Sequence, residues 1–361
     1  MKRIVPILLI VALLLTGCSG LLDSSYHSVT RHEVQNSQTG DDNISVRSYS
    51  ELCSTLIALI GEGRSNSIIT VSQYDQSKVE PDTQQAIAEV MATDPIAAYA
   101  VEHIEYELGT NAGQQAIAVS ITYLHSRTEI LRIRHYSNQS LVDGALADAL
   151  NACDAGIVMY IENYQDMDFD LWVSAYSAAH PEKVMEVPEV VATVYPEAGA
   201  ARVVELKFSY ENSRDVLRAM QTNVKALFDE AMAYAGTDGT QAERFEKLYT
   251  FLIGQNPDFE LETSITPAYS LLIHGVGDSK AVAQIYAAMC TRAGLECITV
   301  TGTRAGEPWY WNFVSCDGAY YHVDLLACRQ TEAFAFRLDE DMSGYVWDYS
   351  AYTTQIAESA T

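Results

Sequence analysis

The chain has 361 residues, long enough for more than one domain, and 48% of them are hydrophobic, which is typical of a globular protein with a sizeable core. Its 48 Asp and Glu residues outnumber its 22 Lys and Arg residues, so the formal net charge is −26. A surface this acidic repels nucleic acid and anionic polymers, and we therefore expect no nucleic-acid partner.

Residues 1–17 have the pattern of a secretory signal peptide. Lys2 and Arg3 precede an apolar run over 4–15, and small residues lead up to Cys18. The ending Leu-Thr-Gly-Cys resembles the bacterial lipobox, which implies cleavage before Cys18 and a lipid on its sulfur. The alternative is a plain signal peptide followed by a chance cysteine. We expect a chain anchored by its lipid on the extracytoplasmic face of a bacterial membrane, with a flexible polar tether over 18–47.

Two segments of similar pattern follow, over 48–140 and 141–235. Asp94-Pro95 in the first is echoed by His180-Pro181 in the second. Each segment shows an apolar strand, a short helix, two further strands and a second helix, and Ser126 begins a capping box that marks one helix start. We expect two duplicated small α+β units. Neither carries paired carboxylates, a histidine cluster or a phosphate-binding loop, so their expected role is binding or spacing.

A turn-rich break over 235–240 opens the last domain, 236–361. A helix is expected over 241–254, and a second begins near Ser279, where apolar residues recur at helical spacing. A helix start points free N–H groups and partial positive charge at its first residues, so a nucleophile is often placed there. An N-cap serine is the ordinary alternative for Ser279.

The dipeptide Asp317-Gly318 predicts a tight hairpin between two strands. A two-residue turn pairs Cys316 with Ala319 and Val314 with Tyr321. Because strand side chains alternate between faces, one face then carries five residues: Trp309, Trp311, Phe313, His322 and Asp324. Trp309 becomes the diagonal neighbour of Asp324, within side-chain reach. A helix start facing two adjacent strands, the second with an Asp, is the layout of a nucleophile–base–orienter triad.

Several spaced blocks over about residues 225–355 resemble the transglutaminase-like superfamily. They are Ala268-Tyr269-Ser270-Leu271-Leu272, Ser279-Lys280-Ala281, Ala293-Gly294-Leu295-Glu296-Cys297, Gly306-Glu307-Pro308-Trp309-Tyr310-Trp311-Asn312, Asp317-Gly318-Ala319-Tyr320-Tyr321-His322-Val323-Asp324 and the tail Tyr345-Val346-Trp347-Asp348. The resemblance implies an α+β fold in which a helix N-terminus packs on an antiparallel, papain-like sheet. It also implies a Cys–His–Asp triad, which falls by position on Ser279, Trp309 and Asp324, and only the aspartate matches.

This departure decides the expected chemistry. A serine hydroxyl needs a general base within hydrogen-bond reach, and an indole N–H donates but cannot accept a proton. We therefore expect a catalytically degenerate, non-enzymatic module that binds a cell-envelope protein, peptide or glycan. The alternative is a hydrolase or acyl-transferase in which Ser279 uses another base, His322 or His274.

Three further expectations concern the same domain. Cys290 lies three turns into the helix and is read as a core residue rather than a nucleophile. The residues Trp309, Tyr310, Trp311 and His322 could line a ligand groove, although strand aromatics are more often core. The cysteine spacing matches no zinc pattern and no Asp-rich calcium loop is present, so we expect neither metal nor cofactor.

Overall fold

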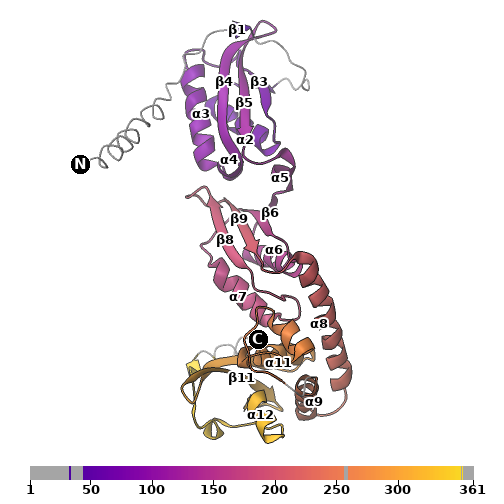
Figure 1. The fold of residues 1–361 in the computed structure, drawn as a ribbon. Coiled ribbons are helices and arrows are strands. Elements are labelled where there is room, and N and C mark those ends of the chain that lie inside the picture. The colour runs from indigo at the N-terminus through magenta and orange to yellow at the C-terminus, as the bar shows by residue number, and fades with distance from the viewer. Residues whose placement is uncertain (1–31, 34–43, 256–258, 351, 353–361) are drawn as a thin grey trace, which may run out of the picture. The chain divides into compact units, whose positions relative to one another are not determined.

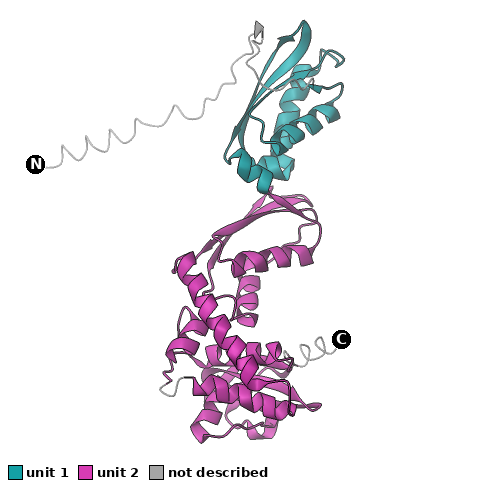
Figure 2. Cartoon of the chain, turned by 90° about the vertical axis from the view of Figure 1, so that its right-hand side faces the viewer, with its two compact units in different colours: residues 1–132 teal, residues 133–361 magenta. Residues whose placement is uncertain are grey.

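The computed structural model describes residues 32–33, 44–255, 259–350 and 352. The expected signal peptide, Cys18 and most of the expected tether lie outside the described residues. The chain is mixed α+β and divides into two compact units, 1–132 and 133–361 (Figure 2). None of the described helices combines the length and apolarity that crossing a bilayer requires.

The first unit is a five-stranded sheet with helices against it (Figure 1). Its elements are β1 (His32–Glu33), β2 (Ile44–Ser45), α2 (Tyr49–Gly61), β3 (Asn66–Thr70), α3 (Val79–Thr93), α4 (Pro95–Ala100), β4 (Val101–Asn111), β5 (Gln114–Tyr123) and α5 (Arg127–Arg132). The strand order is β1-β4-β5-β3-β2. Apolar side chains of α2 and the sheet form the core, including the fully buried Leu56, Ile60 and Ile117.

Local signals explain two boundaries in this unit. The capping box at α5 is confirmed, because Glu129 N–H donates to Ser126 Oγ at 3.3 Å and Ser126 N–H donates to the Glu129 carboxylate at 2.8 Å. The second boundary is the start of strand β4 at Val101, which follows the short helix α4. Asp94 caps the Ala97 N–H and Pro95 occupies the first turn, so the chain forms the short helix α4 first.

The second unit begins with another α+β segment. Its elements are β6 (Arg134–Tyr136), α6 (Gln139–Asn151), β7 (Gly156–Ile161), α7 (Phe169–Ala179), β8 (Glu189–Tyr195), β9 (Arg202–Ser209) and α8 (Arg214–Ala235). The sheet order β6-β7-β9-β8 repeats the pairing of β2-β3-β5-β4, with one parallel pair and two antiparallel pairs in each case. Because β6 pairs with β7, this sheet begins before residue 141. The sequence analysis expected the boundary between the two α+β units at residue 141.

The rest of the second unit packs helices on an antiparallel sheet. The elements are α9 (Gln241–Gly254), α10 (Pro267–Tyr269), η1 (Ser270–His274), α11 (Ser279–Arg292), β10 (Cys297–Arg304), β11 (Glu307–Cys316), β12 (Ala319–Val323), α12 (Leu325–Thr331), η2 (Asp339–Asp341) and β13 (Tyr345–Trp347). The strand order is β12-β11-β10-β13. One core joins α8, α9 and α11 to the sheet, with Phe228, Phe245 and Tyr286 fully buried.

The hairpin between β11 and β12 has the predicted register. Cys316 pairs with Ala319, Val314 with Tyr321 and Phe313 with His322. The second strand ends at Val323, one residue before Asp324. The reason is local: the Asp324 carboxylate accepts the Ala327 N–H at 3.0 Å and so begins helix α12.

Candidate functional site

The start of α11 places Ser279 against strand β11. Ser279 is the first residue of the helix and is 8% exposed. Its Oγ accepts the backbone N–H of Tyr310 at 3.3 Å. The N-cap is Asp278, whose carboxylate accepts the Ala281 N–H at 2.8 Å, so the interpretation of Ser279 as the cap is wrong. A carboxylate one residue earlier satisfies the same N–H group.

Asp324 lies at the centre of a buried network. It is 1% exposed. Its Oδ2 accepts the indole N–H of Trp309 at 2.9 Å and the hydroxyl of Tyr345 at 2.6 Å. The Arg304 guanidinium lies 3.5 Å from the same oxygen. The contact between Trp309 and Asp324, expected from the hairpin register, is thereby confirmed. Burial, and then the bond to Asp324, raise the pKa of Tyr345.

The cationic partner of Asp324 is Arg304, on β10. Its guanidinium carbon lies 5.2 Å from the centre of the Trp309 ring and 5.4 Å from that of Tyr345. This is cation–π geometry with both rings. A guanidinium keeps its proton in proteins, so it can stabilise the carboxylate charge but cannot act as a base. Sequence reasoning missed Arg304, and it included Tyr345 only as part of the family-like tail.

The aromatic residues next to this network are buried. Trp311 is 1% exposed and His322 is 2% exposed, so neither is available to line an open ligand groove. Trp311 Nε1 donates to His322 Nδ1 at 2.9 Å, and His322 Nε2 lies 3.0 Å from an Asp339 oxygen. The expected groove thus keeps only Trp309 and Tyr310 as partly exposed members. The side chains of Trp311 and His322 are buried because they pack with Met342 and Trp347 in a small core on one face of the sheet.

The contacts of His322 also exclude it as the base of Ser279. Both ring nitrogens are occupied, one as acceptor from Trp311 and the other as donor to Asp339. Burial lowers its pKa, while the neighbouring Asp339 carboxylate acts in the opposite direction.

The other proposed substitutes are placed elsewhere. His274 lies in η1, with its ring edge-on to Tyr269 at 5.3 Å. Cys290 is fully buried, and burial raises its pKa well above the ordinary range of a thiol. This agrees with a core role and leaves little thiolate for attack. Among the described residues, the Ser279 hydroxyl makes no hydrogen bond to an imidazole or a carboxylate, and its Oγ instead accepts the Tyr310 N–H.

The space between Ser279 and Asp324 is closed. It is lined by side chains of α11, β11 and α12, and none of it is large enough for a water molecule. Asn312 lies on the wall of this space, and its side-chain NH₂ donates to the Ala283 carbonyl at 2.8 Å. Its side-chain oxygen, Oδ1, is buried without a hydrogen-bond partner. Among the described residues, no group of three or more His, Cys, Asp or Glu side chains is placed to hold a metal ion.

No protein-family profile and no curated protein matches the chain. Solved structures match parts of it. A TGase has 8% identity and a TM-score of 0.26, over 54% of this chain and 58% of its own length. A cysteine protease candidate from Cytophaga hutchinsonii has 11% identity and a TM-score of 0.25, over 44% of this chain and 70% of its own. A protease candidate from Parabacteroides distasonis has 7% identity and a TM-score of 0.22, over 72% of this chain and 40% of its own length. Likeness this slight carries no argument about activity, which must come from the site itself.

Proposed function

We propose that this chain is a lipid-anchored extracytoplasmic protein whose C-terminal segment is a catalytically degenerate transglutaminase-like module that binds a cell-envelope partner. The lipobox-like ending at Cys18 and the sequence blocks over 225–355 support the assignment. The two α+β segments before it, with the same strand pairing, support the interpretation that they are duplicated units that present the module or bind a partner themselves.

One observation supports the interpretation that the module is not an enzyme. Asp324, the only triad position with the family's residue type, is held by Trp309, Tyr345 and Arg304 rather than by an imidazole. A nucleophilic serine needs a proton acceptor, but Trp309 and Tyr345 donate hydrogen bonds to the carboxylate and Arg304 forms an ion pair with it. Ser279 is nearly buried, and the space between it and Asp324 leaves no room for a water molecule.

The test is active-site labelling of the full-length chain. A broad fluorophosphonate probe is added and any adduct is located by mass spectrometry, with Ser279→Ala as the matched control. We expect no adduct on Ser279. A stoichiometric adduct that disappears in Ser279→Ala would contradict the proposal and would favour a hydrolase or acyl-transferase with a base outside the family pattern.

A further inference from the structure

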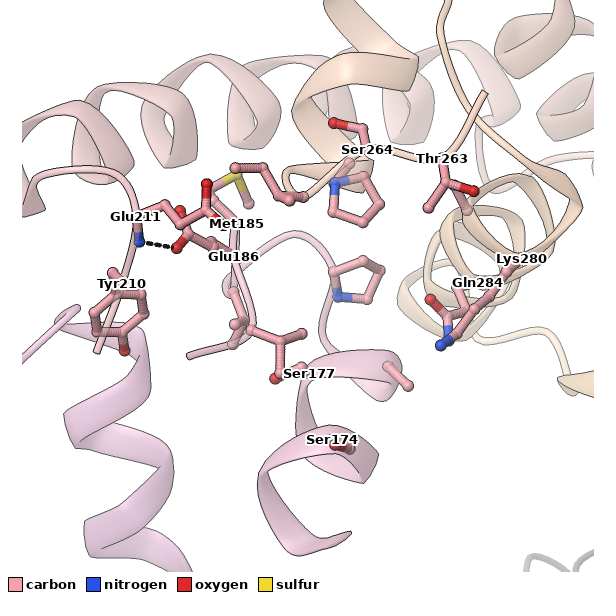
Figure 3. A pocket seen from close by; sticks show the side chains of 18 of the residues that line it. Ser174, Ser177, Met185, Glu186, Tyr210, Glu211, Thr263, Ser264, Lys280 and Gln284 are labelled. Carbon is pink, nitrogen blue, oxygen red and sulfur yellow. Dashed lines mark hydrogen bonds between the residues drawn. The ribbon is translucent and has the colours of Figure 1, made fainter. Parts of the chain in front are cut away.

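A cavity of about 610 Å³ lies within the second unit, between helix α7 and the start of α11 (Figure 3). We propose that this cavity binds a short cationic peptide carrying a lysine-type ammonium group. The inference rests on the proposed binding function and names its ligand class. The volume lies within the roughly 300–1,000 Å³ range of small-molecule sites.

The cavity has three main walls, and the chain at the end of β9 adds Tyr210 and Glu211 to its lining. Helix α7 contributes Ser174 and Ser177, and the segment before β8 contributes Met185 and Glu186. The third wall comes from the loop before α10 and the first turns of α11, with Thr263, Ser264, Lys280 and Gln284. The triad-equivalent Ser279 is not part of this lining, so the cavity is separate from the closed space beside Asp324.

The charge of the lining favours a cation. Four carboxylates line the cavity, against one ammonium group: Glu186, Glu189, Glu211 and Asp278 against Lys280. The Lys280 ammonium lies 5.9 Å from the Tyr310 ring centre, where cation–π attraction holds it. The net charge of the wall is thus negative.

The buried carboxylate fixes the cavity's shape. Glu186 is 5% exposed, and its oxygens accept the Glu211 N–H at 2.5 Å and the Asn212 side-chain amide at 2.8 Å. These bonds hold the turn after β9 against the segment before β8. The side chains of Glu189 and Glu211 are exposed and remain available to a ligand.

The remaining wall is apolar. Val187 is 49% exposed and Ile265 is 52% exposed, although both are large hydrophobic residues, and Met185 and Pro267 lie beside them in the lining. Such a wall accommodates the aliphatic stem of a long cationic side chain, while carboxylates contact its charged end. An anionic polymer would meet like charge, and a neutral glycan would leave the negative charge of the carboxylates without a counter-charge.

The experiment measures peptide binding to the full-length chain, purified in detergent. Fluorescein-labelled Ala-Lys-Ala-Lys is titrated and followed by anisotropy, with Ala-Glu-Ala-Glu and an uncharged chitotetraose as competitors. The variants are Glu189→Gln with Glu211→Gln, Ser174→Tyr to fill the cavity from an exposed helix position, and Glu230→Gln on α8 as a single-charge control outside the cavity. We expect the double Gln variant to weaken binding about five- to tenfold, which corresponds to about 1.0–1.4 kcal/mol for the two exposed ion pairs together.

Further results complete the test. Ser174→Tyr should abolish binding, while Glu230→Gln and Ser279→Ala should leave the affinity unchanged. Binding that falls equally in Glu230→Gln would reflect the general acidity of the surface and would overturn the inference, as would preferred binding of the acidic peptide or chitotetraose, or no binding of the cationic peptide. The peptide titration tests the ligand of the cavity, whereas fluorophosphonate labelling tests the reactivity of Ser279. A wrong ligand assignment and a wrong non-enzymatic proposal therefore give different results.

Discussion

Replacing Asp324 by Asn should destabilise the C-terminal part of the second unit substantially. In a working triad this change chiefly removes activity, but here the carboxylate is a structural centre. Its Oδ2 accepts two side-chain donors, Trp309 and Tyr345, and its Oδ1 caps α12. An asparagine side chain has one oxygen in place of two. Either the two side-chain donors at Oδ2 or the backbone donor at Oδ1 must therefore face the amide NH₂ of the asparagine.

The magnitude follows from counting the affected bonds. If the Asn oxygen faces Trp309 and Tyr345, the α12 cap is lost at about 1 kcal/mol. Each of the two remaining bonds becomes neutral rather than charge-assisted, at about 1 kcal/mol apiece. The total is about 3 kcal/mol. The loss of the carboxylate charge next to Arg304 acts in the same direction.

Urea unfolding followed by tryptophan fluorescence measures this loss. Three of the four tryptophans, at 309, 311 and 347, lie on the affected sheet. Asp317→Asn is the matched control, because Asp317 is in the hairpin turn at φ 53°, a conformation that asparagine also adopts. If Asp324→Asn costs no more than the ~0.5 kcal/mol typical of a surface substitution, the structural role of Asp324 is refuted.

Three further predictions concern the same unit. Gly302→Ala should cost about 1–3 kcal/mol in urea unfolding, because a Cβ there would overlap the Val346 carbonyl and lie 2.7 Å from the Trp311 ring; an unchanged midpoint would contradict this packing. Burial lowers the pKa of His322 in the folded protein below the value of about 6.5 in the unfolded chain. Between these two values the unfolded chain binds more protons than the folded protein, so the free energy of unfolding should rise as the pH rises to about 6.5. His322→Gln should flatten the difference in unfolding free energy between pH 5.5 and 7.5, and an unchanged slope would refute its contribution. Among the described cysteines only Cys53 is not buried, so 5,5′-dithiobis(2-nitrobenzoic acid) should label it first in the native protein, and rapid labelling of Cys290 would contradict the core role of that thiol.

Much of the local structure was predictable from short-range signals. The helix over 241–254 matches α9, and the Asp317-Gly318 turn set the register of the hairpin. The contact of Trp309 with Asp324 followed from that register. These features depend on residues near one another in the sequence, where turn chemistry and side-chain periodicity act directly.

The partners that decide the chemistry of the site were not predictable in this way. Arg304 and Tyr345 are 41 positions apart and meet because β10 pairs antiparallel with β13, with these two residues opposite each other. No local pattern sets that pairing. The cavity of about 610 Å³ likewise combines α7 with the start of α11, and Trp311 and His322 are buried against the rings of Tyr345 and Trp347 on β13.

The position of Arg304 between two aromatic rings has an evolutionary consequence for a module of this kind. Trp309→His alone would supply an imidazole, but Asp324 would still be occupied by Tyr345 and Arg304, and the new histidine would lose the indole's contact with the guanidinium. Recovering a triad would thus require changes at several positions, and each early step would reduce stability without supplying activity. Under the proposed function, a single substitution at Trp309 therefore cannot supply a triad, because Tyr345 and Arg304 continue to hold the Asp324 carboxylate.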